Sequence, residues 1–172
     1  AARALEPAGV PAMAKDFLVA PEQVWAARVA GAGGILLIIR MLDQTRLSAL
    51  LELALELGMF VLLEAFDRDD LERAAGLRVA DDDNAGPVLL GLNCRNLRTL
   101  QVDPGRFGEL AEHFPDLYPK VAESGIEGAE DVTAVASLGY SVALVGSALM
   151  KTPDPGTLVQ DMIRAGRSAS VG

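Results

Sequence analysis

Phe60-Val61-Leu62-Leu63-Glu64, residues 60–64, is an apolar run that ends in a carboxylate. A short, nearly continuous apolar run is typical of a strand in a parallel sheet that is covered on both faces. Residues 14–17 and 92–97 also end apolar runs with polar or charged side chains. A charged side chain at the end of a buried strand is costly to desolvate unless it is paired or used. Three such strand ends therefore predict one shared pocket.

Strand-like runs alternate with helical patterns along the chain, at a spacing that fits successive βα units. Between the second and third runs, apolar residues recur at helical spacing, with Asp43 as the N-cap and Gly58 as the stop. A further helix is expected to begin at Asp67, and residues 78–86 to form a loop. The predicted strands cover residues 10–17, 34–39, 59–64, 88–93, 119–123 and 142–146.

This alternation permits either a doubly wound sheet or a (β/α)8 barrel. The sequence contains neither of the glycine-rich loops, G-x-G-x-x-G and G-x-x-x-x-G-K-[ST], that a nucleotide-binding doubly wound sheet would carry. A complete barrel takes about 250 residues, and residues 1–8 read as the tail of a helix from a longer parent. We therefore predict an α/β fold, an incomplete TIM barrel. Residues 1–172 are expected to form a single partial domain that lacks the first two βα units.

The composition narrows the class of partner and the compartment. The chain has 172 residues, 51% of them hydrophobic, and a formal net charge of -9. Such an acidic balance argues against nucleic acid or an anionic membrane as the main partner. The single cysteine, Cys94, suits the reducing cytoplasm, and no apolar run is long enough to span a bilayer. The sequence contains no metal ligands at a suitable spacing. It also does not indicate an oligomeric state.

Lys15 and Glu64 are the candidate acid/base groups. Lys15 shares a strand face with Met13 and Phe17, and Glu64 shares one with Leu62 and Phe66. If both point inward, they meet at the mouth of the barrel, where acid/base work is done. The alternatives are a surface lysine that snorkels from the strand end and a carboxylate that caps a helix or braces a loop.

Asn93 and Arg95 lie two residues apart and are expected to point the same way. The planar fork of arginine suits a carboxylate or a phosphate, and asparagine offers both a donor and an acceptor. Cys94 then points to the opposite face, where it should pack against helices and be inert. Trp25 is expected to pack a helix onto the sheet, and His113 to be structural or solvated.

A glycine next to a serine follows each of the last two predicted strands. The turns are Glu123-Ser124-Gly125 and Gly146-Ser147. Glycine lets a ligand approach the backbone, and the amides of such turns bind phosphate at the corresponding end of TIM barrels. The alternative is ordinary βα turn chemistry.

Five motifs in one order carry a family resemblance. They are Lys15-Asp16-Phe17, the strand-ending Glu64, residues 93–99 (Asn-x-Arg-Asn-Leu-Arg-Thr), residues 123–126 (Glu-Ser-Gly-Ile) and residues 145–150 (Val-Gly-Ser-x-Leu-Met). Together they resemble indole-3-glycerol phosphate synthase, a carboxy-lyase of tryptophan biosynthesis, from residue 10 to about residue 150. The resemblance implies that the six strands are the third to eighth of the barrel.

The resemblance also implies the reaction. It is a decarboxylating ring closure of 1-(2-carboxyphenylamino)-1-deoxyribulose 5-phosphate to indole-3-glycerol phosphate, without a cofactor. By motif, Lys15 resembles the general acid, Glu64 its partner in dehydration, and Asn93 and Arg95 the groups that orient the substrate.

The remaining site residues are carried over in the same way. Phe17 is expected to enclose the aromatic ring, and Glu123 and Ser124 to line the site. The phosphate cradle is expected to comprise Gly125, Gly146 and Ser147.

The sequence departs from the family pattern in ways that leave alternatives open. The glutamate and lysine of the family's first strand are absent, and Ala65-Phe66 replaces a common Val-His pair. We expect this chain alone to lack synthase activity and to associate or unfold readily. The alternatives are another phosphate-binding TIM-barrel isomerase or epimerase, and a non-catalytic barrel fragment.

Overall fold

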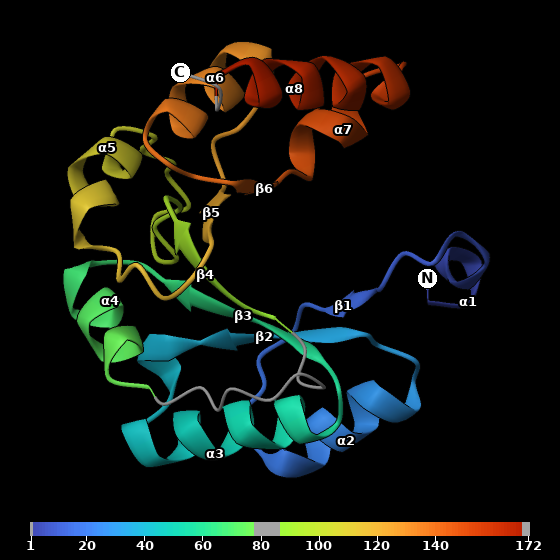
Figure 1. Ribbon diagram of the computed structural model, residues 1–172, viewed down its shortest axis with the longest axis vertical. Coiled ribbons are helices and arrows are strands. Elements are labelled where there is room, and N and C mark those ends of the chain that lie inside the picture. The colour runs from blue at the N-terminus through green and yellow to red at the C-terminus, as the bar shows by residue number, and fades with distance from the viewer. Residues whose placement is uncertain (1, 78–86, 170–172) are drawn as a thin grey trace.

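The computed structural model describes residues 2–77 and 87–169, so the predicted loop at 78–86 lies outside the described residues. Six strands form one parallel sheet in which each strand pairs with the next along the chain. The sheet curls, and the longer helices lie along its outer side (Figure 1). The strands are β1 (Met13–Ala14), β2 (Gly34–Ile38), β3 (Phe60–Ala65), β4 (Val88–Asn93), β5 (Lys120–Glu123) and β6 (Val142–Leu144).

All six predicted strands are present, although the first is much shorter than the predicted residues 10–17. In β1 only Met13 and Ala14 pair, with Gly34 and Ile35 of β2. Pro11 has no backbone N–H to donate to a ladder. Lys15 therefore follows the strand rather than belonging to it, directly beyond the last paired residue.

Helices connect the strands as the βα pattern predicts. The longer ones are α2 (Pro21–Val29), α3 (Gln44–Glu56), α4 (Arg68–Ala75), α6 (Ala129–Ser137) and α8 (Pro155–Ala169). Asp43 caps α3 by accepting a hydrogen bond from the Arg46 amide at 2.8 Å, as predicted. Asp67 likewise caps α4. Short helical segments complete the fold: α1 (Ala2–Leu5), η1 (Glu6–Ala8), η2 (Ile39–Met41), α5 (Arg106–Leu110), η3 (Ala111–His113) and α7 (Ser147–Lys151).

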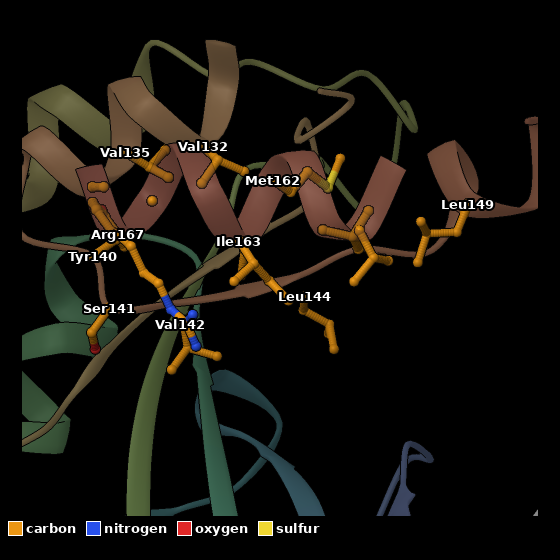
Figure 2. Close-up of a pocket in the computed structure, with 15 residues that line it drawn as sticks. Val132, Val135, Tyr140, Ser141, Val142, Leu144, Leu149, Met162, Ile163 and Arg167 are labelled. Atoms are coloured by element: carbon orange, nitrogen blue, oxygen red, sulfur yellow. The ribbon is translucent and has the colours of Figure 1, made fainter. Parts of the chain in front are cut away.

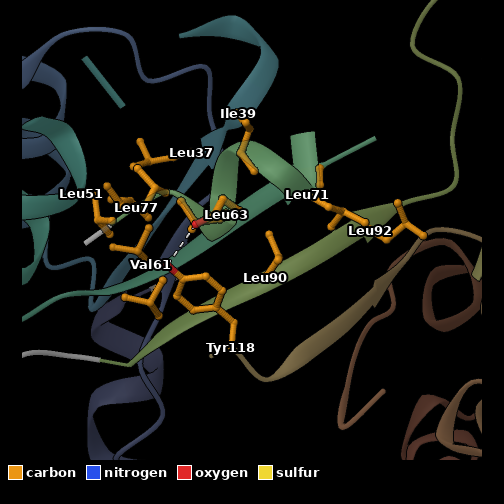
Figure 3. Packing of buried hydrophobic residues seen from close by; sticks show 14 of the residues in the cluster. Leu37, Ile39, Leu51, Val61, Leu63, Leu71, Leu77, Leu90, Leu92 and Tyr118 are labelled. Atoms are coloured by element: carbon orange, nitrogen blue, oxygen red, sulfur yellow. Dashed lines mark hydrogen bonds between the residues drawn. The ribbon is translucent and has the colours of Figure 1, made fainter. Parts of the chain in front are cut away.

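Two apolar layers lie on opposite faces of the sheet because side chains alternate along each strand. Leu63 and Leu92 are fully buried in the outer layer, between the sheet and the helices (Figure 3). Leu62, Phe66 and Val121 belong to a smaller inner cluster. Glu64 lies between Leu62 and Phe66 in sequence, so the same alternation turns its carboxylate inward.

The predictions for residues outside the site have mixed outcomes. Cys94 is 1% exposed and belongs to the outer core, and burial raises the pKa of its thiol to about 12. His113 is exposed on η3. The prediction for Trp25 is wrong, because its side chain is 51% exposed. Val24 is the buried residue of α2, and the next position lies about 100° further round the helix. Among the described residues, no helix is both long and apolar enough to cross a bilayer.

Candidate functional site

The predicted site residues gather around one cavity at the carboxyl ends of the strands. The cavity has a volume of about 540 Å³ and is lined by residues at or just beyond the carboxyl ends of all six strands. Nine of the ten predicted site residues line it: Lys15, Phe17, Glu64, Asn93, Arg95, Glu123, Ser124, Gly146 and Ser147. The prediction of one shared pocket is therefore confirmed.

A network of ion pairs and hydrogen bonds joins the ends of four strands at the cavity floor. The Lys15 ammonium donates to Glu64 Oε2 at 3.2 Å and to Glu123 Oε2 at 3.5 Å. The Asn93 amide donates to the other oxygen of Glu64, Oε1, at 2.7 Å. Both oxygens of Glu64 thus accept from side chains of the site. These contacts differ from the alternatives, which were a surface lysine that snorkels from the strand end and a carboxylate that caps a helix or braces a loop.

Glu123 is the most perturbed group of the site. Its side chain is 1% exposed, and its Oε1 atom has no hydrogen-bond partner among the described residues. Burial and the neighbouring Glu64 raise the pKa of Glu123 to about 8, and Lys15 opposes them. Glu123 therefore holds a proton near neutral pH, whereas a carboxylate in water does not. The motif predicted Glu123 only as a lining residue, and its buried acid character is a finding of the structure.

Hydrogen bonds from neighbouring segments fix the backbone just beyond Glu64. The amide of Phe66 donates to Asp70 Oδ2 at 2.9 Å, and Arg106 donates to the Phe66 carbonyl. Arg40 donates to the same Asp70 oxygen and lies 4.4 Å above the Phe66 ring. These contacts fix the backbone two residues beyond Glu64.

Arg95 lines the cavity with its guanidinium partly engaged. Its Nη1 donates to the Leu100 carbonyl at 3.1 Å, and its amide donates to Asn93 Oδ1 at 2.9 Å. Arg95 also pairs with Val102 in an isolated antiparallel bridge, so the loop folds back on itself. A guanidinium held in this way keeps donors free for an anion.

The two glycine-serine turns contribute unequally to the cavity. Ser124, Gly146 and Ser147 line it, whereas Gly125 is not among its lining residues. Ser124 and Gly125 have φ values of 66° and 82°, a left-handed conformation that favours glycine. A Cβ at Gly125 would lie 3.0 Å from Val102 Cγ1, so backbone conformation and packing account for this glycine. Its role in phosphate binding stays a prediction.

Sequence reasoning missed several apolar residues of the wall. Leu36 and Ile38 line the cavity from β2, and the two-residue alternation of that strand could have identified them. The other missed lining residues are Asp16, Leu97, Leu144 and Val145.

A larger cavity, of about 790 Å³, lies elsewhere, between α6, α8 and β6 (Figure 2). Its described lining is mostly aliphatic, as with Val135, Leu144 and Met162, and Arg167 is its one charged residue. It therefore lacks the pairs of acid and base that the smaller cavity contains. No cluster of three or more His, Cys, Asp or Glu in the described part of the chain could hold a metal ion.

Comparison with solved structures concerns the fold alone. The 3-hexulose-6-phosphate synthase from Salmonella typhimurium superposes with a TM-score of 0.76 at 17% identity, over 97% of this chain and 78% of that one. The orotidine 5'-phosphate decarboxylase from Pyrococcus horikoshii OT3 gives a TM-score of 0.68 at 16% identity, over 96% and 78%. The six curled parallel strands are thus a TIM-barrel-like fold.

Comparison of sequences is more specific. The indole-3-glycerol phosphate synthase family model matches residues 2–162. Indole-3-glycerol phosphate synthase 1 of Streptomyces coelicolor is 41% identical over 157 residues, which are 91% of this chain and 55% of the relative. The indole-3-glycerol phosphate synthase of Beutenbergia cavernae is 43% identical over 157 residues, again 91% of this chain and 55% of the relative. The chain thus spans about 55% of the length of these curated relatives. With this match and the motifs gathered around one cavity, the chain belongs to the indole-3-glycerol phosphate synthase family.

Proposed function

We propose that this chain carries the ring-closing site of an indole-3-glycerol phosphate synthase. The observation that supports this most is the Lys15 ammonium, which lies within 3.5 Å of two buried carboxyl groups in a cavity that Arg95 also lines. The substrate would be 1-(2-carboxyphenylamino)-1-deoxyribulose 5-phosphate. Its two anionic ends match a guanidinium at one wall and backbone turns at the other.

In the proposed reaction, Lys15 acts as the general acid. The aryl carbon that bears the carboxylate attacks the sugar carbonyl, and Lys15 donates a proton to the carbonyl oxygen, which becomes a hydroxyl. Loss of carbon dioxide from the same aryl carbon restores the electron pair to the ring. Protonation of the new hydroxyl then lets it leave as water, and the adjacent ring methylene loses a proton to form the ring double bond, with Glu64 as the acid/base partner. Asn93 keeps the Glu64 carboxylate oriented through its 2.7 Å hydrogen bond.

The remaining residues bind and orient the substrate. Arg95 takes the carboxylate, and Phe17 covers the aromatic ring at the opening. Glu123 and Ser124 border the reacting atoms. The phosphate cradle is formed by Gly125, Gly146 and Ser147.

We further propose that the six strands are the third to eighth of the barrel and that residues 1–172 form one partial domain. The curled six-stranded parallel sheet and the partial coverage of the relatives support this assignment. The substrate is a phosphorylated small molecule, and the chain works without a cofactor, nucleic acid or membrane. The single cysteine favours the cytoplasm as its location.

The test is turnover of the substrate by the longer protein that carries these residues, followed by indole fluorescence and by release of carbon dioxide. Lys15→Ala should lower kcat by about 10²-fold to 10⁴-fold, the usual contribution of a general acid. Lys151→Ala is the matched control, because Lys151 is exposed and does not line the cavity. A near-normal rate for Lys15→Ala rejects Lys15 as the acid. Binding of phosphate ligands without turnover favours a non-catalytic barrel instead.

A further inference from the structure

Gly91 occupies a position in the middle of β4 that faces the floor of the site. It pairs with Glu64 of β3, and Asn93, two residues further along, pairs with Glu123 of β5. A Cβ at Gly91 would lie 3.0 Å from Glu123 Cδ and 3.2 Å from Leu62 Cδ1, and closer still to Glu123 Oε1. The carboxyl group of Glu123 therefore fills the space that any side chain at 91 would need.

Backbone conformation does not explain this glycine. Gly91 is not among the described glycines with a positive φ, so other residues can adopt its backbone angles. In a strand interior, glycine is less stable than alanine because it loses more conformational freedom on folding. The space that the Glu123 carboxyl occupies is therefore the remaining explanation for glycine at position 91.

The Glu123 carboxyl is held more by packing than by hydrogen bonds. Its Oε1 atom has no partner in the described part of the chain, and its one polar contact is the 3.5 Å hydrogen bond from Lys15 to Oε2. A buried carboxyl with so few hydrogen bonds is poorly compensated for its loss of hydration. It would move towards water if a side chain at 91 filled the space that it occupies.

We propose that Gly91 is a positioning residue of this site: by lacking a side chain, it lets the Glu123 carboxyl lie buried beside Glu64 and Lys15. A larger residue at 91 displaces that carboxyl towards the cavity opening. The effect of Gly91 on turnover rests on the proposed function. The position of the Glu123 carboxyl does not, because it can be measured without substrate.

Two charged groups act on Glu123: Lys15, which follows β1, and Glu64, the next-to-last residue of β3. Arg95 and Asp16 line the same cavity. Burial and Glu64 raise the pKa of Glu123, and Lys15 lowers it. Displacement towards solvent removes the largest of these causes, so the pKa of Glu123 should fall towards its ordinary range.

The first experiment is a double-mutant cycle followed by urea unfolding of the full chain. Gly91→Ala should lower the urea midpoint when Glu123 is present, and should leave it nearly unchanged in the Glu123→Ala background. Gly108→Ala is the matched control, since its Cβ would meet only Leu138 Cδ1, at 4.0 Å. An equal loss in both backgrounds overturns the proposal, because the methyl group would then clash with something other than Glu123.

The second experiment is a carbon-13 NMR titration of the glutamate carboxyl groups, with Glu123 assigned by the signal that Glu123→Gln removes. Glu123 should titrate near pH 8 in the parent chain and at least one pH unit lower in folded Gly91→Ala. An unchanged titration in folded Gly91→Ala overturns the proposal. If Gly91→Ala does not fold, adding Glu123→Asp, one methylene shorter, should restore folding, and failure of that rescue also overturns it. Neither readout uses the synthase substrate, so neither depends on the proposed reaction.

Discussion

Replacement of Glu123 by glutamine should remove a loss of stability that the chain suffers as the pH rises towards 8. In the folded chain the pKa of Glu123 is raised from 4.5 to about 8, by burial first and by Glu64 second. Between these two values the folded state keeps a proton that the unfolded state has released. Because the folded state binds more protons, the free energy of unfolding falls as the pH rises through this window.

The size of the effect follows from the same two pKa values. One proton held by only the folded state is worth about 1.4 kcal/mol for each pH unit. Over the window from 4.5 to about 8, this amounts to about 5 kcal/mol at most. Such a loss is comparable with the total stability of a small domain, about 5–15 kcal/mol. Lys15 and Glu64 interact with the same proton, which spreads the loss over a wider pH range.

The assay is urea unfolding at several pH values between 5 and 9, for the parent chain and for Glu123→Gln. The parent should lose stability relative to Glu123→Gln as the pH rises, since glutamine keeps the shape of the neutral acid and does not titrate. Glu127→Gln is the matched control, because Glu127 is exposed in the following turn. Parallel pH curves for the parent and Glu123→Gln would refute the reasoning, since Glu123 would then be ionised in the folded chain.

Three further predictions concern stability and reactivity, and all use the purified chain. Asp70→Ala should cost about 2–3 kcal/mol in urea unfolding, because it leaves the buried Phe66 amide without its acceptor and removes one of the two carboxylates that pair with Arg40. Arg68→Ala, which breaks an exposed pair, should cost less than about 0.5 kcal/mol. Asp43→Ala should cost about 1 kcal/mol in the same assay, because the N-cap of α3 is lost. Cys94 should react with a thiol-specific disulfide reagent only as fast as the chain opens, because its buried thiol has a pKa of about 12; rapid labelling of the folded chain contradicts this.

The sequence was sufficient to predict which strand ends meet. Residues that end parallel strands lie at one edge of the sheet, so Lys15, Glu64 and Asn93 could be grouped from their positions alone. The two-residue alternation also assigned Cys94 to the outer face correctly. Trp25 shows the limit of this reasoning, because a helix pattern does not state how wide its buried face is.

The relation between Gly91 and Glu123 could not be predicted from the sequence. It depends on the register between β4 and β5. That register places the Glu123 carboxyl in the space that a side chain at Gly91 would occupy. Strand position predicts the face on which a side chain lies, but not which neighbour fills the volume beside it. Gly125 illustrates the converse, since it belongs to a motif of the site and yet does not line the cavity.

The charge balance of the cavity gives the buried acid a physical role. Lys15 and Arg95 bring two positive charges to its lining, whereas Asp16, Glu64 and Glu123 would bring three negative charges if all were ionised. An anionic ligand would then meet an excess of like charge at close range, which is unfavourable in a partly buried site. A proton on Glu123 removes that excess, and the ligand's own negative charge in turn favours the protonated form of Glu123. Binding of an anion and retention of this proton therefore support each other, and the space at Gly91 is what keeps Glu123 buried enough for the proton to be retained.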